Sequence, residues 1–221
     1  MSTRSYGQFC GLTRGADLLG GRWTLPIIRD LLLGPARFSD LLAGFPGIPT
    51  NQLSTRLKEM EADGIIRRAL APRGTRYELT EWGRALEPVI TEIGRWGAAR
   101  MEQPAEGEIV TEAGLATSLR TSFAGRLHPG PATPTTFEIS ANDLVAHATV
   151  QENSIEVSTG PSEAPTIVIS AGEHFLGLVT GKITADEYQQ LPGVTIHGDV
   201  SLLQEFTELF RITPIATLHA A

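Results

Sequence analysis

The sequence predicts an α+β protein built from two domains. The first observation is a change in charge: residues 1–103 carry 14 Lys and Arg and 11 Asp and Glu, whereas residues 104–221 carry 4 and 14. The second is a change in pattern, because helical spacing of apolar residues dominates the first half and strand-like alternation the second. All three tryptophans lie in the first half and all five histidines in the second. We therefore expect one domain at 1–103 and another at 104–221, divided at Gln103.

The composition restricts the class of protein. Of the 221 residues, 41% are hydrophobic and 19% are charged, as in globular proteins rather than disordered chains. No apolar run approaches the roughly 18–20 residues that a membrane span needs. The segment Met1–Tyr6 is polar and lacks the apolar core of a signal peptide. We therefore expect a cytoplasmic protein without a membrane span.

The sequence contains no pattern typical of an enzyme or a metal site. Its single cysteine excludes an internal disulfide and a cysteine-based zinc site. The five histidines are widely spaced, so none forms a short metal-binding pair. There is no glycine-rich phosphate loop and no nucleophile elbow. We expect no catalytic residues, no metal and no cofactor.

Helical spacing of apolar residues runs through the first part of the chain. It predicts a helix around Leu12–Leu19 and a second helix over Trp23–Leu33. Ser39 is the expected N-cap of a short third helix. A fourth helix is predicted over Thr50–Asp63, capped by its first residue and followed by Gly64 at the C′ position.

The helix over Thr50–Asp63 has the chemistry of a recognition helix. Leu53, Leu57 and Met60 form one apolar stripe, which we expect to face the core. Base edges in the major groove offer hydrogen-bond donors and acceptors, which polar side chains at the start of such a helix recognise. The residues expected to contact DNA are Thr50, Asn51, Gln52, Ser54, Thr55, Arg56 and Lys58. The alternative interpretation is an ordinary solvated helix face.

A basic hairpin is predicted directly after this helix. The segments Ile65–Ala71 and Thr75–Leu79 are strand-like, and Pro72–Thr75 is the turn between them. Four arginines and no acidic residue lie within residues 65–76. A hairpin of this kind forms a wing that contacts the phosphate backbone or the minor groove. The expected contacts are Arg73, Thr75 and Arg76; ordinary solvated charge is the alternative.

Several separated motifs in this half resemble the HxlR family of bacterial winged helix-turn-helix regulators. The resemblance covers about residues 6–100 and is carried, in order, by Phe9–Leu12, Leu18–Thr24, Arg29–Gly34, Arg37–Leu41, Gly47–Asn51, Leu53–Glu59 and Tyr77–Thr80. It implies a dimeric transcription regulator with the helix over Thr50–Asp63 in the major groove and the Arg73 hairpin as the wing. It also implies that Arg37–Phe38 is a short strand pairing with the wing, and we include Arg37 among the expected DNA contacts.

A long helix after the wing suggests a dimer. Thr80 is its expected cap, and the helix is predicted to continue to about Arg100 with a kink at Pro88. Apolar residues spaced 4, 3, 4 and 3 apart form a seam able to pack on another helix. A two-fold dimer contacts two half-sites about 34 Å apart in a pseudo-palindromic operator. The expected interface residues are Leu12, Trp82, Leu86, Val89, Ile93 and Trp96; the alternative is that the seam packs inside its own domain.

Cys10 is a candidate redox or electrophile sensor. HxlR regulators often carry a cysteine near this position, and the resemblance implies that some of these regulators sense oxidants or electrophiles through this cysteine. The residue lies just before the first predicted helix, where a helix N-terminus lowers the pKa of a thiol. A small buried packing residue is the alternative.

The second half predicts one helix, an antiparallel meander, and then helices interleaved with strands. The expected helices cover Leu115–Phe123, Ala171–Thr180, Thr184–Gln190 and a last helix that Asp199 caps and that ends near Phe210. The expected strands are Thr135–Ser140, Asp143–Val150, Ser154–Ser158, Thr166–Ser170 and Val194–Gly198. Together these strands predict a five-stranded, mainly antiparallel sheet.

This order resembles the sterol carrier protein type-2-like fold over about residues 110–213. The similar stretches are Pro165–Ile169, Leu176–Asp186, Val194–Asp199 and Leu209–Arg211. The resemblance implies an apolar cavity for fatty acyl, sterol or other lipophilic molecules. The candidate lining residues are Phe123, Phe137, Phe175, Leu178, Val179, Phe206 and Phe210. The alternative is that these side chains simply fill a compact core.

Three functional hypotheses follow. The first is a homodimeric DNA-binding transcriptional regulator, in such families most often a repressor, whose acidic half binds a lipophilic effector. The second is a regulator that is switched by oxidation or adduction of Cys10. The third is a lipid carrier or sequestering protein whose DNA-binding half no longer functions. Replacing wing arginines separates the first two from the third, because only the regulators lose DNA affinity.

Overall fold

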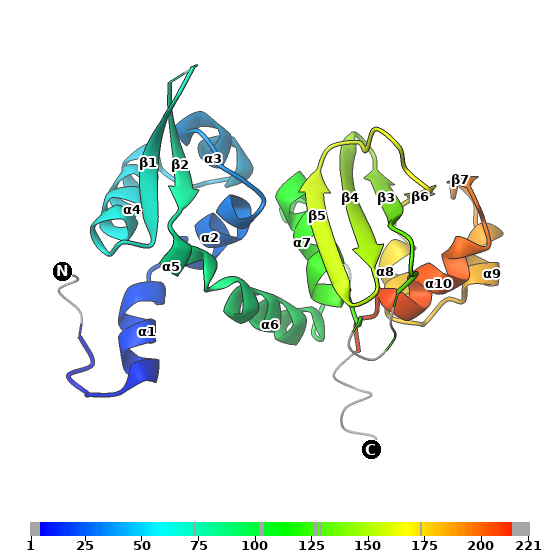
Figure 1. Ribbon diagram of the computed structural model, residues 1–221, viewed down its shortest axis with the longest axis horizontal. Helices are drawn as coiled ribbons and strands as arrows, with labels where there is room; N and C mark the ends of the chain where they lie inside the picture. Colours follow the sequence, from blue (N-terminus) through cyan, green and yellow to red (C-terminus); the bar gives the residue numbers. More distant parts are fainter. Residues whose placement is uncertain are drawn as a thin grey trace. The chain divides into compact units, whose positions relative to one another are not determined.

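The computed structural model describes residues 5–72, 74–101, 104–125, 128, 130–172 and 174–213 (Figure 1). The chain forms two compact units, Met1–Ile90 and Thr91–Ala221. The predicted division at Gln103 lies outside the described residues and stays a prediction.

The first unit contains helices followed by a two-stranded hairpin. Its elements are α1 (Gly11–Leu19), α2 (Thr24–Leu32), α3 (Phe38–Gly44), α4 (Thr50–Ala62), β1 (Ile66–Ala71), β2 (Gly74–Leu79) and α5 (Glu81–Arg84). Strands β1 and β2 are antiparallel, and Ala71 lies opposite Gly74. The buried apolar core beneath them is formed by α2, α3, α4, β1 and β2, with Ile27, Leu31, Leu53, Leu57 and Ile66 among its fully buried members, and two leucines of α1 pack against it. The predicted order of helices and hairpin is therefore confirmed for this unit.

Helix α4 follows the predicted span, with one correction at its start. Pro49 is the N-cap and Thr50 is already the first helical residue, so the predicted capping by Thr50 is wrong by one position. The C-terminal end matches the prediction. Gly64 has φ +75°, its N–H donates to the carbonyl of Glu61, and the N–H of Ile65 donates to the carbonyl of Met60. This hydrogen-bond pattern is a Schellman motif, for which glycine is the preferred residue.

The start of α3 differs from the prediction. Arg37, not Ser39, is the N-cap, and its backbone N–H donates to the Asp40 carboxylate at 3.0 Å. The predicted short strand at Arg37–Phe38 is also shifted, because Phe38 is helical and Ala36 makes the pair with Tyr77 of β2. An acidic residue in the first turn thus sets the helix start two residues earlier than a serine cap would.

The long helix predicted after the wing is divided in two. Thr80 caps α5 as predicted, since its Oγ1 accepts the N–H of Gly83 at 3.0 Å. Helix α5 ends at Arg84, and α6 begins at Glu87 and continues to Ala98. Pro88 explains the break, because a proline ring clashes with the carbonyl four residues earlier and supplies no N–H. The expected continuous helix is therefore wrong, and the chain breaks next to Pro88, where a kink was predicted.

The second unit is an α+β arrangement around one sheet. After α6 come α7 (Glu112–Ser122), β3 (Thr135–Ala141), β4 (Leu144–Gln151), β5 (Ser154–Thr159), β6 (Ile167–Ser170), α8 (Phe175–Val179), α9 (Ala185–Gln189), β7 (Ile196–Gly198) and α10 (Leu202–Leu209). The strand order is β5-β4-β3-β6-β7. Among the strands that the structure describes in this sheet, β3 and β6 form the one parallel pair. The predicted five-stranded, mainly antiparallel sheet is confirmed.

Alternation along the strands gives this sheet an apolar face. Phe137 and Ile139 of β3 are fully buried, as are Ala146 and Ala148 of β4. Helix α7 packs along β4 and β5. On the other face of β3, Glu138 accepts the N–H of Ser162 at 2.7 Å, so its carboxylate holds the connection between β5 and β6.

Several element boundaries of the second unit differ from the predictions: α7 begins at Glu112, three residues before the expected Leu115, and β7 begins at Ile196 rather than Val194. Helix α8 is shorter than the expected span from Ala171 to Thr180. Ser201, not Asp199, occupies the N-cap of α10. The carboxylate of Asp199 instead accepts the N–H and the hydroxyl of Ser201 at 3.0 and 2.6 Å, so it forms a turn before the helix rather than its cap.

Two searches of the described residues give negative results. None of their helices combines the length and the apolar character that crossing a membrane requires. No group of three or more His, Cys, Asp and Glu side chains among them is placed to hold a metal ion.

Candidate nucleic-acid interface

Helix α4 presents a polar face because its apolar stripe is buried. Leu53, Leu57 and Met60 are at most 1% exposed, which fixes the rotation of the helix. The opposite side is open to solvent, and the predicted contacts that are exposed there are Thr50, Asn51, Gln52, Thr55 and Lys58. Ser54 and Arg56 lie at the flanks and are half-buried. The face that carries the predicted hydrogen-bonding groups is therefore accessible to a partner.

Two predicted contacts of α4 are engaged inside the chain. The Asn51 side-chain oxygen accepts the N–H of Gln52 at 2.9 Å. The Arg56 guanidinium pairs with Glu59 at 2.8 Å and lies so close to Gly21 that a Cβ there would be 2.3 Å from it. Arg56 and Asn51 are therefore held by neighbouring groups of the chain.

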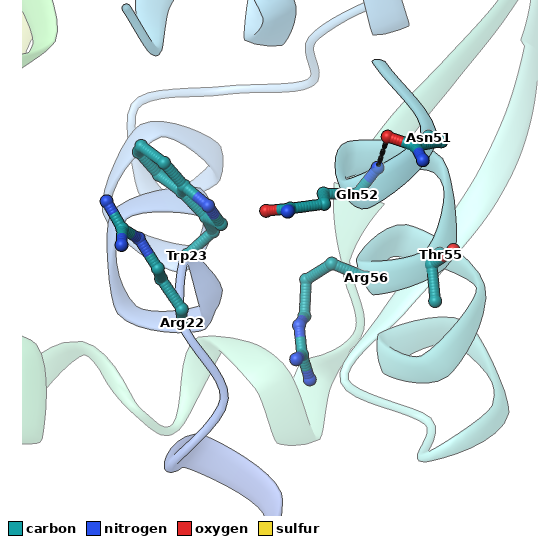
Figure 2. Close-up of a pocket in the computed structure, with 6 residues that line it drawn as sticks. All are labelled: Arg22, Trp23, Asn51, Gln52, Thr55 and Arg56. Carbon is teal, nitrogen blue, oxygen red and sulfur yellow. Dashed lines mark hydrogen bonds between the residues drawn. The ribbon is translucent and has the colours of Figure 1, made fainter. Parts of the chain in front are cut away.

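A pocket of about 220 Å³ lies beside this face, lined by Arg22, Trp23, Asn51, Gln52, Thr55 and Arg56 (Figure 2). Figure 2 shows the amide end of the Gln52 side chain pointing toward Trp23, which belongs to the start of α2. The guanidinium of Arg22 lies over the Trp23 ring, 5.1 Å from its centroid. Sequence reasoning missed Arg22 and Trp23. The signal was weak: a basic and an aromatic residue directly after two glycines.

The wing is less basic than its sequence indicates. Arg67 pairs with Glu78 on the adjacent strand at 2.6 Å. Arg68 reaches back to Glu61 of α4, with its Nε 2.9 Å from a carboxylate oxygen, and this pair lowers the pKa of Glu61. Arg76 is exposed and makes no ion pair among the described residues. The cross-strand and helix partners therefore leave Arg76 as the available cation of this hairpin within the part of the chain that is described.

The remaining predicted contacts of the first unit are placed as follows. Thr75 is exposed beside Arg76 on β2, and Arg37 is half-buried at the start of α3. Arg73 lies outside the described residues.

Cys10 is exposed at the start of α1. It occupies the N-cap position. Backbone N–H groups of Thr13 and Leu12 stabilise its thiolate and lower the pKa of the thiol. In the single chain its side chain is open to solvent rather than packed in a core, and a sensing role stays a prediction.

The residues of the predicted dimer seam are mostly exposed in the single chain. Trp96 is 74% exposed and Leu12 is 82% exposed. Trp82, Val89 and Ile93 are also exposed, between 43% and 55%. Leu86 differs, because it is half-buried and packs against the core of the first unit. Large apolar side chains left in water are typical of a surface that another molecule covers.

The side chains predicted to line a cavity in the second unit pack on one another. Phe206 is fully buried, stacks on Phe210 at 4.6 Å, and lies 5.7 and 5.9 Å from the rings of Phe137 and Phe175. Phe123 meets Phe210 at 5.9 Å. Leu178 and Val179 are buried as well. These contacts are what the alternative, a filled core, requires, and a ligand cavity at these residues stays a prediction.

Comparisons with known proteins agree with this geometry in the first part of the chain. Residues 18–105 match the family described as HxlR-like helix-turn-helix. The uncharacterized HTH-type transcriptional regulator YvaP of Bacillus subtilis is 38% identical over 86 residues, which are 38% of this chain and 80% of that protein. The HTH-type transcriptional regulator YodB of the same organism is 40% identical over 83 residues, 36% of this chain and 74% of its own.

Among solved structures, the redox regulator HypR in its oxidized form is similar at 31% identity, over 42% of this chain and 99% of that one, with a TM-score of 0.40. The family match, residues 18–105, includes α2 to α6 and therefore the polar helix and the hairpin. The chain belongs to the HxlR-like helix-turn-helix family and is a bacterial DNA-binding transcriptional regulator.

Proposed function

We propose that this regulator acts as a homodimeric repressor that binds a pseudo-palindromic operator through α4 and the wing. The observation that carries the proposal is the exposed polar face of α4, held outward by its buried stripe and followed directly by a hairpin with a free arginine. The hydrogen-bonding groups on α4 suit base edges, and Arg76 suits a phosphate.

The dimer is supported by the exposed apolar side chains of α1, α5 and α6. A symmetric dimer that covers Leu12, Trp82, Val89, Ile93 and Trp96 removes a large apolar area from water. Two copies of α4 then meet two half-sites, about one helical turn of DNA apart. A monomer would leave each wing to bind alone.

The effector part of the proposal is a lipophilic molecule bound by the second unit. It rests on the resemblance of the second unit's sequence to a fold that binds lipophilic molecules, whereas the buried aromatic side chains contact one another as in a filled core. An effector regulates only if it binds the free and the DNA-bound conformations with different affinity. Because the phenylalanine rings contact one another, a ligand must separate them in order to enter.

The DNA-binding proposal is tested by comparing two wing arginines. A duplex is first selected from a random library with the full chain, and its affinity is measured against salt concentration. Arg76→Ala removes one phosphate contact, so the slope of log K against log salt becomes shallower by about 0.9 and the affinity at 0.1 M salt falls about eightfold. The double variant Arg67→Ala with Glu78→Ala is the matched control, because it removes a compensated ion pair and leaves the net charge of the wing unchanged. Equal effects of the two variants would contradict the proposed use of Arg76, and a lipid carrier predicts no effect of either.

A second candidate function is redox or electrophile sensing through Cys10. The specific observation is an exposed thiol whose pKa is lowered by the first amides of α1. Oxidant or quinone would then release DNA from the parent chain but not from Cys10→Ser. Equal responses of the two chains would exclude this function and leave the effector hypothesis.

A further inference from the structure

We propose that the pocket between Arg22–Trp23 and α4 is a binding site for a backbone phosphate of DNA, and that the Arg22 guanidinium binds the phosphate oxygens. The proposal rests on the DNA-binding function above and adds a contact on the flank of α4. Nothing in the sequence pattern of the helix or of the wing assigns a role to these two residues.

The lining of the pocket favours an anion. Two of its six lining residues are arginines, three more carry hydrogen-bonding side chains, and none is acidic. Arg56 is already paired with Glu59 outside the lining. Arg22 is exposed and makes no ion pair among the described residues. The pocket therefore retains one uncompensated guanidinium, the group that binds phosphate oxygens best.

Trp23 prepares Arg22 for this contact. The guanidinium lies over the indole ring, 5.1 Å from its centroid, so ring and cation attract each other. The ring in turn packs against Phe45 of the first unit's core at 5.9 Å. A long side chain that is already oriented loses less conformational entropy when it binds.

Two energetic costs are concentrated at Trp23. Its backbone adopts φ +76°, a left-handed conformation that a bulky residue rarely takes. Its indole N–H is buried and has no hydrogen-bond partner among the described residues. Backbone strain and unsatisfied buried polar groups are often found at functional sites, where the surrounding structure holds them in place.

The position of the pocket identifies the source of the anion. Asn51, Gln52 and Thr55 line it from the same helix face that is proposed to contact bases (Figure 2). A helix lying in the major groove is bordered by phosphates of both strands. An oxyanion in this pocket is therefore the phosphate nearest α4 rather than a distant metabolite.

The test uses the full chain, the selected duplex and three variants. Arg22→Ala is expected to make the salt slope shallower by about 0.9 and to lower the affinity about eightfold at 0.1 M salt. Arg22→Lys keeps the charge and is expected to keep the slope. Arg100→Ala is the matched control, because Arg100 is also exposed but lies far along the chain in the second unit. Thermal unfolding of each variant verifies that an exposed substitution leaves the fold intact.

Each outcome decides between the hypotheses. If Arg76→Ala weakens DNA binding and Arg22→Ala behaves like Arg100→Ala, the proposed phosphate site is wrong and the proposed DNA-binding function stands. If selection with the parent chain yields no duplex that the chain binds, the proposed DNA-binding function itself is refuted. If inorganic phosphate raises the melting temperature of the parent chain but not of Arg22→Ala, while DNA affinity is unchanged by the substitution, the pocket serves a free oxyanion and the DNA assignment is overturned.

Discussion

Replacing Phe206 by alanine distinguishes a filled core from a ligand cavity in the second unit. Phe206 is fully buried and contacts three other phenylalanine rings, of which Phe210 is stacked on it at 4.6 Å. Truncating a phenylalanine in a packed core costs about 3–5 kcal/mol, because apolar contacts are lost and a void remains. Three ring neighbours place the expected loss at the upper end of that range, since each aromatic pair contributes about 0.5–1.5 kcal/mol beyond the area that it buries.

Hydrogen exchange on the full chain measures this loss of stability within the second unit. Amides of β3 and α10 report the free energy of opening around the aromatic side chains. Phe175→Ala is the matched control, because Phe175 is only half-buried and is expected to lose less.

A loss below about 1 kcal/mol in Phe206→Ala would refute the packed-core argument, because only a ring that already borders empty space gives up so little. In that case a fatty acid should protect the same amides in the parent chain in proportion to the logarithm of its concentration.

Three further predictions concern the first unit and the seam. Gly83→Ala is expected to destabilise the chain by about 1–3 kcal/mol in thermal unfolding, because the new Cβ would lie 2.1 Å from the carbonyl oxygen of Ile65; an unchanged melting temperature would contradict it. The Cys10 thiol is expected to react with iodoacetamide with a pH midpoint below that of free cysteine, since its pKa is lowered and the thiolate is the nucleophile; a midpoint at or above that of cysteine would disprove this. Ile93→Asp is expected to raise the dimer dissociation constant by at least about tenfold in sedimentation equilibrium, with an unchanged constant arguing against the seam.

The parts of the fold that the sequence predicted well are those set by local periodicity. The apolar stripe of α4 and the glycine at its C′ position are both properties of a short segment, and both are found as expected. The helix starts were less accurate. The Asp40 side chain, three residues after Arg37, moved the start of α3 to Arg37, and such a bond depends on backbone geometry that the identity of one candidate cap does not reveal.

The break between α5 and α6 shows two sequence signals in conflict. The 4-3-4-3 spacing of apolar residues indicated one continuous seam, and Pro88 indicated a bend. The conformational restriction of proline determines the result, because a proline ring cannot be accommodated inside an unbroken helix without losing a hydrogen bond. Spacing therefore describes which side chains share a surface more reliably than it describes the continuity of the backbone that carries them.

The charge available to DNA was the feature least accessible from the sequence. The sequence has four arginines on the hairpin, but Arg67 and Arg68 are paired with carboxylates that lie 11 and 7 residues away in the chain. Arg22 was not counted and is unpaired within the described part of the chain. A cation held by a carboxylate releases few counterions when it meets a phosphate, because its charge is already compensated.

The measured salt dependence of DNA binding should therefore follow the unpaired guanidiniums rather than the number of arginines. In a chain with a net charge of −7, general attraction to DNA is weak, and each unpaired cation on the α4 side carries a larger share of the affinity. This is why one exposed arginine on the wing and one beside Trp23 are expected to matter more than their paired neighbours on β1.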